Sequence, residues 1–86
     1  MKIELIHAAG CEKCRSAAGV LRQVAEEVAG DHLEWRDVNV LDELDYAVSL
    51  GVLTLPAVAV NGKIEFSSLP TADELRSVLQ RHAENL

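Results

Sequence analysis

Hydrophobic residues recur at characteristic spacings along the chain, and these spacings predict its strands and helices. The segment Lys2 to Ala8 is short and mostly apolar, which is typical of a buried strand. From Cys14 to Ala29, apolar or small residues recur every three or four positions, which predicts one helix with a single buried stripe. The residues of that stripe are Ala17, Val20, Leu21, Val24, Ala25 and Val28.

A second strand and a short second helix follow. The strand is predicted from Leu33 to Val38 or Val40, and its apolar phase shifts between Trp35 and Val38, which indicates a bulge or an early end. Asp42 is the predicted cap of a helix that runs through Leu50. A strand, a helix and a second strand in this order predict parallel pairing through a right-handed crossover. The side chains expected to face inwards from the second helix are Leu44, Ala47 and Val48.

The last third of the chain predicts a hairpin and a closing helix. Pro56 is the first residue of a predicted strand that continues through Ala57 to Val60, and at a first position its missing N–H does least harm. Asn61-Gly62 is a turn that requires positive φ, after which Ile64 to Phe66 returns antiparallel. Thr71 to Glu74 has the T-x-x-E pattern of a capping box at a helix start. The inner stripe of that helix is expected to contain Leu75, Val78, Leu79, His82 or Ala83, and Leu86.

The composition limits the classes of function. The chain has 86 residues, 49% of them hydrophobic, which suffices for one domain over residues 1–86 with an apolar core. The net charge is −6 and Lys and Arg form no cluster, so we expect no nucleic-acid binding. No apolar stretch is long enough to span a membrane, and the N-terminus lacks the apolar segment of a signal peptide. We therefore expect a cytoplasmic monomer that does not associate with membranes.

Both cysteines lie in the segment Gly10-Cys11-Glu12-Lys13-Cys14, where the first strand passes into the first helix. The unpaired N–H groups and the dipole of a helix N-terminus stabilise an anion, so Cys11 is predicted to be an exposed nucleophile with a lowered pKa. Cys14 lies about one turn further along the same side and is predicted to be the shielded partner. Lys13 favours the thiolate, whereas Glu12 opposes it. This arrangement favours thiol–disulfide exchange, in which Cys11 attacks and Cys14 resolves the mixed disulfide.

Other uses of the cysteine pair stay open. The two thiols are alternatively small buried hydrophobes, or metal ligands in a metal-binding or metal-carrier protein. A zinc site needs about four ligands, and the three histidines are scattered, so such a metal would lie between two chains. A metal carrier with C-x-x-C after its first strand is also expected to end in a strand, whereas this chain ends in a helix. His7, four residues before Cys11, is a candidate proton acceptor or simply a packed or solvated side chain.

The order β-α-β-α-β-β-α, with C-x-x-C after the first strand and Pro56 before the third, resembles the thioredoxin superfamily over nearly the whole chain. The length is similar to that of small glutaredoxin-like thioredoxins. The resemblance implies an α/β fold with a four-stranded mixed sheet and helices on both faces. It also implies that Cys11 attacks, that Cys14 resolves, that Pro56 is cis beside the disulfide, and that the Leu55 backbone pairs with the substrate. The residues expected to bind substrate are Leu55, Pro56, Gly10, Glu12 and Lys13.

Two departures from the family pattern bear on mechanism. Leu5 stands where larger thioredoxins carry a buried acid, so the proton of Cys14 needs another route or water. Glutaredoxins carry a Gly-Gly-Asp stretch for glutathione after the hairpin, whereas this chain has Phe66-Ser67-Ser68-Leu69, which disfavours glutathione specificity. The sequence thus predicts a thiol–disulfide oxidoreductase that has no cofactor besides its cysteine pair. Its expected partners are disulfide-bearing proteins and a reductase. The alternatives are a metal-binding protein and a glutathione-linked glutaredoxin.

Overall fold

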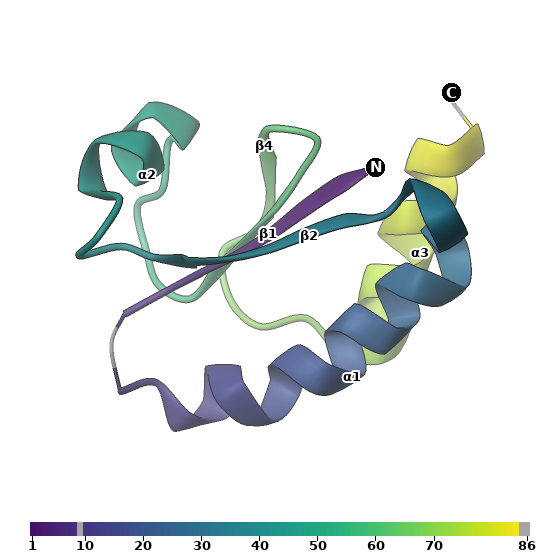
Figure 1. Ribbon diagram of the computed structural model, residues 1–86, viewed down its shortest axis with the longest axis horizontal. Coiled ribbons are helices and arrows are strands. Elements are labelled where there is room, and N and C mark those ends of the chain that lie inside the picture. The colour runs from purple at the N-terminus through teal and green to yellow at the C-terminus, as the bar shows by residue number, and fades with distance from the viewer. Residues whose placement is uncertain (9, 85–86) are drawn as a thin grey trace.

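Strands and helices follow one another in the predicted order. Within residues 1–8 and 10–84, which the computed structural model describes, there are four strands, three α-helices and one 3₁₀ turn (Figure 1). In chain order the elements are β1 (Lys2–His7), α1 (Glu12–Ala29), η1 (Gly30–His32), β2 (Glu34–Asn39), α2 (Leu44–Leu50), β3 (Ala57–Val60), β4 (Lys63–Phe66) and α3 (Ala72–Glu84).

The strands form one mixed sheet in the order β2-β1-β3-β4. β1 and β2 pair in parallel over all six residues of each strand, as the crossover predicts. β3 is antiparallel to β1, and β4 is antiparallel to β3. The expected bulge or early end of the second strand is wrong, because its pairing with β1 is unbroken as far as Asn39. Trp35 and Val38 differ in phase because they face opposite sides of a sheet that is covered on both.

Helices cover both faces of the sheet and create two apolar clusters. α1 and α3 lie side by side on one face, called here the α1/α3 face, and α2 lies on the other, the α2 face (Figure 1). Successive strand residues point to opposite faces, so neighbours in sequence enter different clusters. The buried residues on the α1/α3 face are Ile3, Leu5, Cys14, Leu21, Val24, Ala25, Val58, Val60, Leu75, Val78 and Leu79. Those on the α2 face are Ile6, Val38, Ala47, Ala57 and Ala59.

Three helix residues that were expected to be buried are exposed. Val20 is 53% exposed because α1 packs along a narrower stripe that includes Leu21 but not its neighbour. Leu44 and Val48 are 57% and 66% exposed, because α2 is short and contacts the sheet mainly through Ala47. The second helix therefore leaves apolar surface uncovered next to the sheet edge.

The predicted turn and capping chemistry is present at the hairpin and at α3. Asn61 and Gly62 both have positive φ, at 52° and 83°, which confirms the predicted hairpin turn. The Glu74 N–H donates to Thr71 Oγ1 at 3.1 Å, and the Thr71 N–H donates to Glu74 Oε1 at 2.9 Å. This reciprocal pair is the predicted capping box, and it fixes the first turn of α3.

The start of α2 differs from the prediction. Asp42 is not its cap, because the helix begins at Leu44 and the preceding turn is organised by Asn39. The Asn39 side chain accepts a hydrogen bond from the Leu41 N–H at 2.9 Å. Its carbonyl oxygen accepts from the N–H groups of Asp42 and Glu43 at 3.0 and 3.1 Å. An asparagine turn at the end of β2 therefore delays the helix.

The closing helix α3 has the predicted inner stripe over most of its length. Leu75, Val78 and Leu79 are buried, His82 is half-buried and Ala83 is exposed, so the stripe continues through His82. Leu86 lies outside the described residues. Over the described ranges 1–8 and 10–84, no helix combines the length and the apolar character that crossing a bilayer requires.

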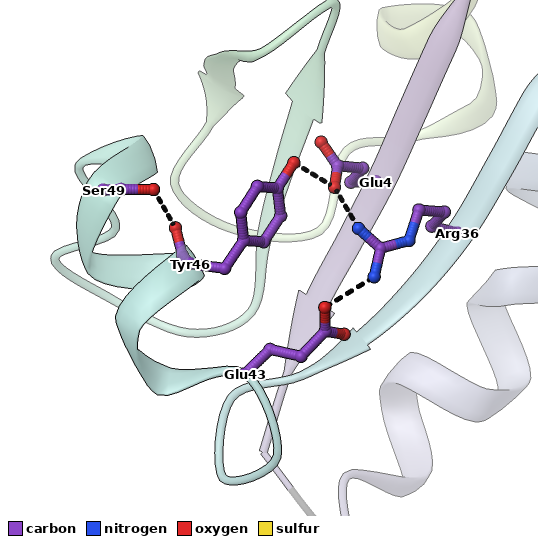
Figure 2. Close-up of polar contacts among 5 residues, drawn as sticks. All are labelled: Glu4, Arg36, Glu43, Tyr46 and Ser49. Atoms are coloured by element: carbon purple, nitrogen blue, oxygen red, sulfur yellow. Dashed lines mark hydrogen bonds and ion pairs between the residues drawn. The ribbon is translucent and has the colours of Figure 1, made fainter.

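A polar network occupies the α2 face beside its apolar cluster (Figure 2). Glu4 is fully buried on β1, and its Oε2 accepts hydrogen bonds from Tyr46 Oη at 2.5 Å and from Arg36 Nη1 at 3.2 Å. Arg36 Nη2 also donates to Glu43 Oε1 at 2.6 Å. No described residue is a hydrogen-bond partner of Glu4 Oε1. The network ties α2 and the turn before it to β1 and β2.

Two side chains of this network have shifted pKa values. The hydrogen bond to Glu4 raises the pKa of Tyr46 above its ordinary 10.0, and burial and the charge of Glu4 add to that shift. The hydrogen bond to Glu43 raises the pKa of Arg36, and the nearby carboxylates add to this against the opposing effect of burial. Both shifts favour the protonated side chains that the network contains.

Candidate active site

Cys11 lies at the N-terminus of α1, as predicted. It is the N-cap residue, with extended backbone angles, and its Sγ accepts a hydrogen bond from the Cys14 N–H at 3.2 Å. The Cys11 carbonyl oxygen accepts from the Arg15 N–H at 3.2 Å, which begins the helical ladder. The sulfur thus occupies the position at which a serine or aspartate oxygen usually caps a helix. A negative charge on this sulfur would be stabilised by the same N–H group and by the helix dipole.

The two cysteines are joined in a disulfide and have unequal environments. Their Cα atoms lie 5.3 Å apart across one helical turn. Cys14 is only 3% exposed and belongs to the cluster of the α1/α3 face, whereas Cys11 is half-buried at its edge. Cys14 is the shielded member of the pair, as predicted, whereas Cys11 is half-buried and not fully exposed. Chemically, the pair can exist as a dithiol or as this intramolecular disulfide.

The residues that flank the cysteines are accessible. Gly10 precedes Cys11 with φ at +82°, a backbone conformation that residues with a Cβ rarely adopt. Glu12 and Lys13 form the exposed start of α1 between the two sulfurs. The turn around the disulfide therefore presents backbone and flexible side chains to solvent, and no bulky residue covers it from the positions between the cysteines.

Pro56 lies at the same end of the central strands as the cysteine turn. The Leu55–Pro56 peptide bond is cis, which confirms the conformation implied by the resemblance. Ala57 pairs with Ile6, so Pro56 precedes the pairing at the end of β1 that leads into the cysteine turn. Leu55 is 39% exposed and stands outside the strand ladder. The sheet thus brings Leu55 and Pro56 to the same end of the central strands as the disulfide, although they come from a distant part of the sequence.

A hollow of about 260 Å³ opens beside the disulfide. It is lined by Leu5, His7, Gly10, Cys11, Cys14, Arg15, Ala18 and Asp37. Arg15 and Asp37 were not identified from the sequence. Asp37 stands directly opposite Leu5 in the parallel register, so the strand pairing brings its carboxylate to this side. One signal in the sequence could have identified Asp37. The shift of the apolar phase between Trp35 and Val38 marks a change of face and not a bulge, and Asp37 shares the face of Trp35.

Among residues 1–8 and 10–84, no group of three or more His, Cys, Asp or Glu side chains is arranged to hold a metal ion. His7 lines the hollow beside the cysteines, whereas His82 lies against Glu65, with 3.4 Å between Nε2 and Oε1. His7 is thus near the cysteine pair and His82 is elsewhere, in keeping with the scattered histidines of the sequence.

The sequence matches the family described as thioredoxin domain over residues 1–80. The chain belongs to the thioredoxin family. It is 31% identical over 81 residues to a thioredoxin of Methanocaldococcus jannaschii, and the alignment covers 94% of each chain. It is 26% identical over 84 residues to a probable thioredoxin of Methanothermobacter marburgensis, with 98% of each chain covered.

Solved structures share the thioredoxin fold. Thioredoxin 1 of Thermosipho africanus superimposes with a TM-score of 0.76 at 19% identity, covering 99% of this chain and 97% of that one. A malarial protein superimposes with a TM-score of 0.72 at 14% identity, covering 94% of each chain. These likenesses support the fold, and the family adds the chemistry. A thioredoxin-family chain whose C-x-x-C cysteines form a disulfide at a helix N-terminus is a thiol–disulfide oxidoreductase.

Proposed function

We propose that this thioredoxin-family chain reduces or exchanges protein disulfides through a mixed disulfide in which Cys11 attacks and Cys14 resolves. The observation that carries this proposal is the inequality of the two sulfurs. Cys11 Sγ accepts a hydrogen bond from a helix N-terminal N–H and is half-buried, whereas Cys14 is 3% exposed. Of the two sulfurs, only that of Cys11 is reachable by a large substrate. Only that of Cys14 is held close enough to attack Cys11 and displace the bound substrate.

The proposed cycle has two displacements. The Cys11 thiolate attacks one sulfur of a substrate disulfide, which forms a mixed disulfide and releases the first substrate thiolate. Cys14, after losing its proton, attacks Cys11 Sγ, which forms the Cys11–Cys14 bond and releases the second substrate thiolate. The two electrons that reduce the substrate come from the dithiol. A separate reductant, for which we propose a reductase protein, restores the dithiol, and no bound cofactor is required.

Serine variants of the two cysteines test the assignment of roles. With insulin as a protein disulfide and dithiothreitol as reductant, Cys11→Ser should lose activity, because no nucleophile remains at the helix N-terminus. In a mixture without dithiothreitol, Cys14→Ser should accumulate a covalent adduct with insulin, visible by mass spectrometry and released by added thiol. If Cys14→Ser turned over insulin as fast as the unaltered chain, the dithiol mechanism would be wrong.

Metal content and electron donor separate the alternatives. Elemental analysis of protein purified without oxygen should find no stoichiometric zinc or copper, whereas a metal carrier would contain one of them. Glutathione alone should reduce the disulfide of the oxidised chain slowly, because the segment after β4 lacks the Gly-Gly-Asp stretch of glutaredoxins. Rapid reduction by glutathione would instead favour the glutaredoxin function.

We further propose that the chain acts as a cytoplasmic monomer of one domain, and its net charge of −6 disfavours self-association.

An exposed apolar surface beside the site supports protein substrates over small molecules. Five of the exposed large hydrophobic residues lie on the segment from the end of β2 to Pro56, and they are Leu41, Leu44, Val48, Leu53 and Leu55. A hollow of about 280 Å³ lies among several of them and extends to Ala47 and Val52. Exposed apolar surface of this kind typically marks a binding site. Because it is continuous with Leu55, an extended substrate segment that pairs with the Leu55 backbone would also cover it.

A substitution at the edge of this surface tests whether it binds substrate. Leu53 is 94% exposed, so Leu53→Ser should not alter the fold. We expect it to lower kcat/KM for insulin several-fold and to leave the rate with a small aromatic disulfide unchanged. Val20→Ser is the matched control, because Val20 is 53% exposed but lies on α1. Equal losses for insulin in the two variants would contradict a docking role.

A further inference from the structure

The proposed dithiol mechanism leaves the proton of Cys14 without an evident acceptor, and this inference rests on that mechanism. Cys14 is 3% exposed, and burial disfavours the thiolate that must attack Cys11. Leu5, which is 1% exposed, faces the same cluster and has no ionisable group. A proton acceptor must therefore come from another residue near the inner sulfur or from bulk water.

His7 shares the hollow with Cys14. It lies two residues after Leu5 on β1, so its side chain points to the same face of the sheet, on which α1 lies. Both His7 and Cys14 line the hollow of about 260 Å³, together with Cys11. Figure 1 shows the end of β1 approaching the start of α1, the helix that carries both cysteines. His7 and Cys14 thus border one common space.

The orientation of the imidazole leaves one nitrogen able to accept a proton. His7 Nδ1 lies 3.2 Å from the Ala8 carbonyl oxygen. A carbonyl oxygen only accepts, so this contact assigns the ring hydrogen to Nδ1. In the neutral ring, Nε2 then carries the lone pair. The backbone therefore selects the tautomer that a general base requires.

We propose that His7 Nε2 accepts the thiol proton of Cys14 across this hollow during resolution of the mixed disulfide. The S–H bond of Cys14 breaks and an N–H bond forms on His7, giving a thiolate and an imidazolium. The thiolate attacks Cys11 Sγ, the Cys11–Cys14 bond forms, and the bond from Cys11 to the substrate breaks. The substrate sulfur leaves with the electron pair and takes up a proton from the imidazolium or from water, so the charge balances.

The other ionisable groups that face the hollow fit this role less well. From α1 they are Arg15 and Cys11, and from β2 there is Asp37. Arginine has no acceptor, and Cys11 is held in the mixed disulfide at this step. A carboxylate with an ordinary pKa of about 3.9 is a poor match for a thiol near 8.5, whereas an ordinary imidazole at about 6.5 is closer. Asp37 is also exposed on the edge strand β2, while His7 is half-buried.

The experiment separates the two displacements in time. The reduced chain is mixed with excess bis(carboxynitrophenyl) disulfide in a stopped-flow instrument, which reports one coloured thiolate for the attack by Cys11 and a second for resolution by Cys14. We expect His7→Gln to leave the first phase unchanged and to slow the second at least about 10-fold near pH 7. The second-phase rates of the unaltered chain and of His7→Gln should become equal above about pH 9, where the thiol ionises without a base.

Three further variants sharpen the result. His32→Gln, at an exposed histidine in η1, should leave both phases unchanged. His7→Ala should be slow in the second phase, and added imidazole should accelerate it, which loss of structure alone would not allow. If the second phase were unchanged in His7→Gln, the proposal would be overturned while the dithiol mechanism stands. The same conclusion would follow if Asp37→Asn slowed the second phase and His7→Gln did not. Release of only one coloured thiolate per unaltered chain would overturn the mechanism itself.

Discussion

The two faces of the sheet are built from different interactions. On the α1/α3 face, branched aliphatic side chains from β1 and β3 pack against two helices, and the buried members of the cluster are apolar residues and Cys14. On the α2 face, the strand residues Ala57 and Ala59 are small, one short helix covers them, and the buried carboxylate of Glu4 lies nearby in a polar network (Figure 2). The first face has more apolar area to bury and should supply most of the stability.

The difference between the faces corresponds to the parts of the site that each one holds. The α1/α3 face fixes the helix whose N-terminus carries both cysteines. The α2 face fixes the segment that leads through Gly51 to the cis proline, and it does so with directional hydrogen bonds from Tyr46 and Arg36. Directional contacts define a position with little apolar area, and they leave Leu44 and Val48 free to remain on the surface. The faces can therefore be distinguished by which substitutions lower the free energy of unfolding.

The largest effect is expected from Leu75→Ala on the α1/α3 face. Leu75 is fully buried between α3 and the sheet, so the substitution removes apolar contacts and leaves a cavity. The free energy of unfolding should fall by about 2 to 5 kcal/mol in urea titrations. Leu44→Ala is the control on α2, where 57% exposure predicts a change below about 1 kcal/mol. Similar losses for the two variants would remove the proposed difference between the faces.

A smaller effect is expected from Glu4→Gln on the α2 face. A glutamine can still accept hydrogen bonds from Tyr46 and Arg36 through its oxygen, but it is neutral, so these bonds lose the charge that strengthens them. The weaker network should lower the free energy of unfolding by about 1 to 3 kcal/mol. Glu34→Gln, at an exposed residue on β2, should change stability by less than about 0.5 kcal/mol. A more stable Glu4→Gln would mean that the buried charge costs more than the network returns.

Tyr46→Phe should have a still smaller effect, and one that depends on pH. At neutral pH the loss of one hydrogen bond to Glu4 should lower the free energy of unfolding by about 1 kcal/mol. The hydrogen bond raises the pKa of Tyr46 in the folded chain, so its contribution is fully present below the ordinary value of 10.0. It is lost as the pH rises from there through the folded pKa. The stability difference between the unaltered chain and Tyr46→Phe should therefore shrink in urea titrations above about pH 10, and a constant difference would contradict the raised pKa.

The sequence allowed the α1/α3 face to be predicted better than the α2 face. Helical periodicity identified α1 and α3 because a wide apolar stripe against a sheet repeats every three or four residues. The T-x-x-E box and Asn61-Gly62 are local signals that need no tertiary context, and both are confirmed. Leu44 and Val48 were misassigned because α2 has only seven residues, and over two turns an exposed apolar residue gives the same pattern as a buried one.

The candidate site could be predicted from the sequence in part. The strand-to-helix position of C-x-x-C indicated the disulfide turn, since the helix N-terminus that caps Cys11 follows directly in sequence. Glu4 was missed because a glutamate between apolar residues of a strand is equally typical of a solvated sheet face. Its burial depends on Tyr46 and Arg36, which are 42 and 32 residues away. Asp37 was missed for the same reason, because only the parallel register brings it opposite Leu5.

The smallest effect is expected from an ion pair at the rim of the α1/α3 face. Arg76 Nη2 on α3 lies 3.2 Å from Glu27 Oε2 on α1, but the two side chains are 37% and 53% exposed. Solvent and salt screen such a pair, so Glu27→Gln should lower the free energy of unfolding by less than about 1 kcal/mol. The difference should disappear at about 1 M NaCl, where the screening length is near 3 Å. A loss that equalled that of Glu4→Gln, or that persisted in high salt, would show that charges at the rim stabilise this face as well. The two faces would then differ only in the amount of polar contact and not in its role.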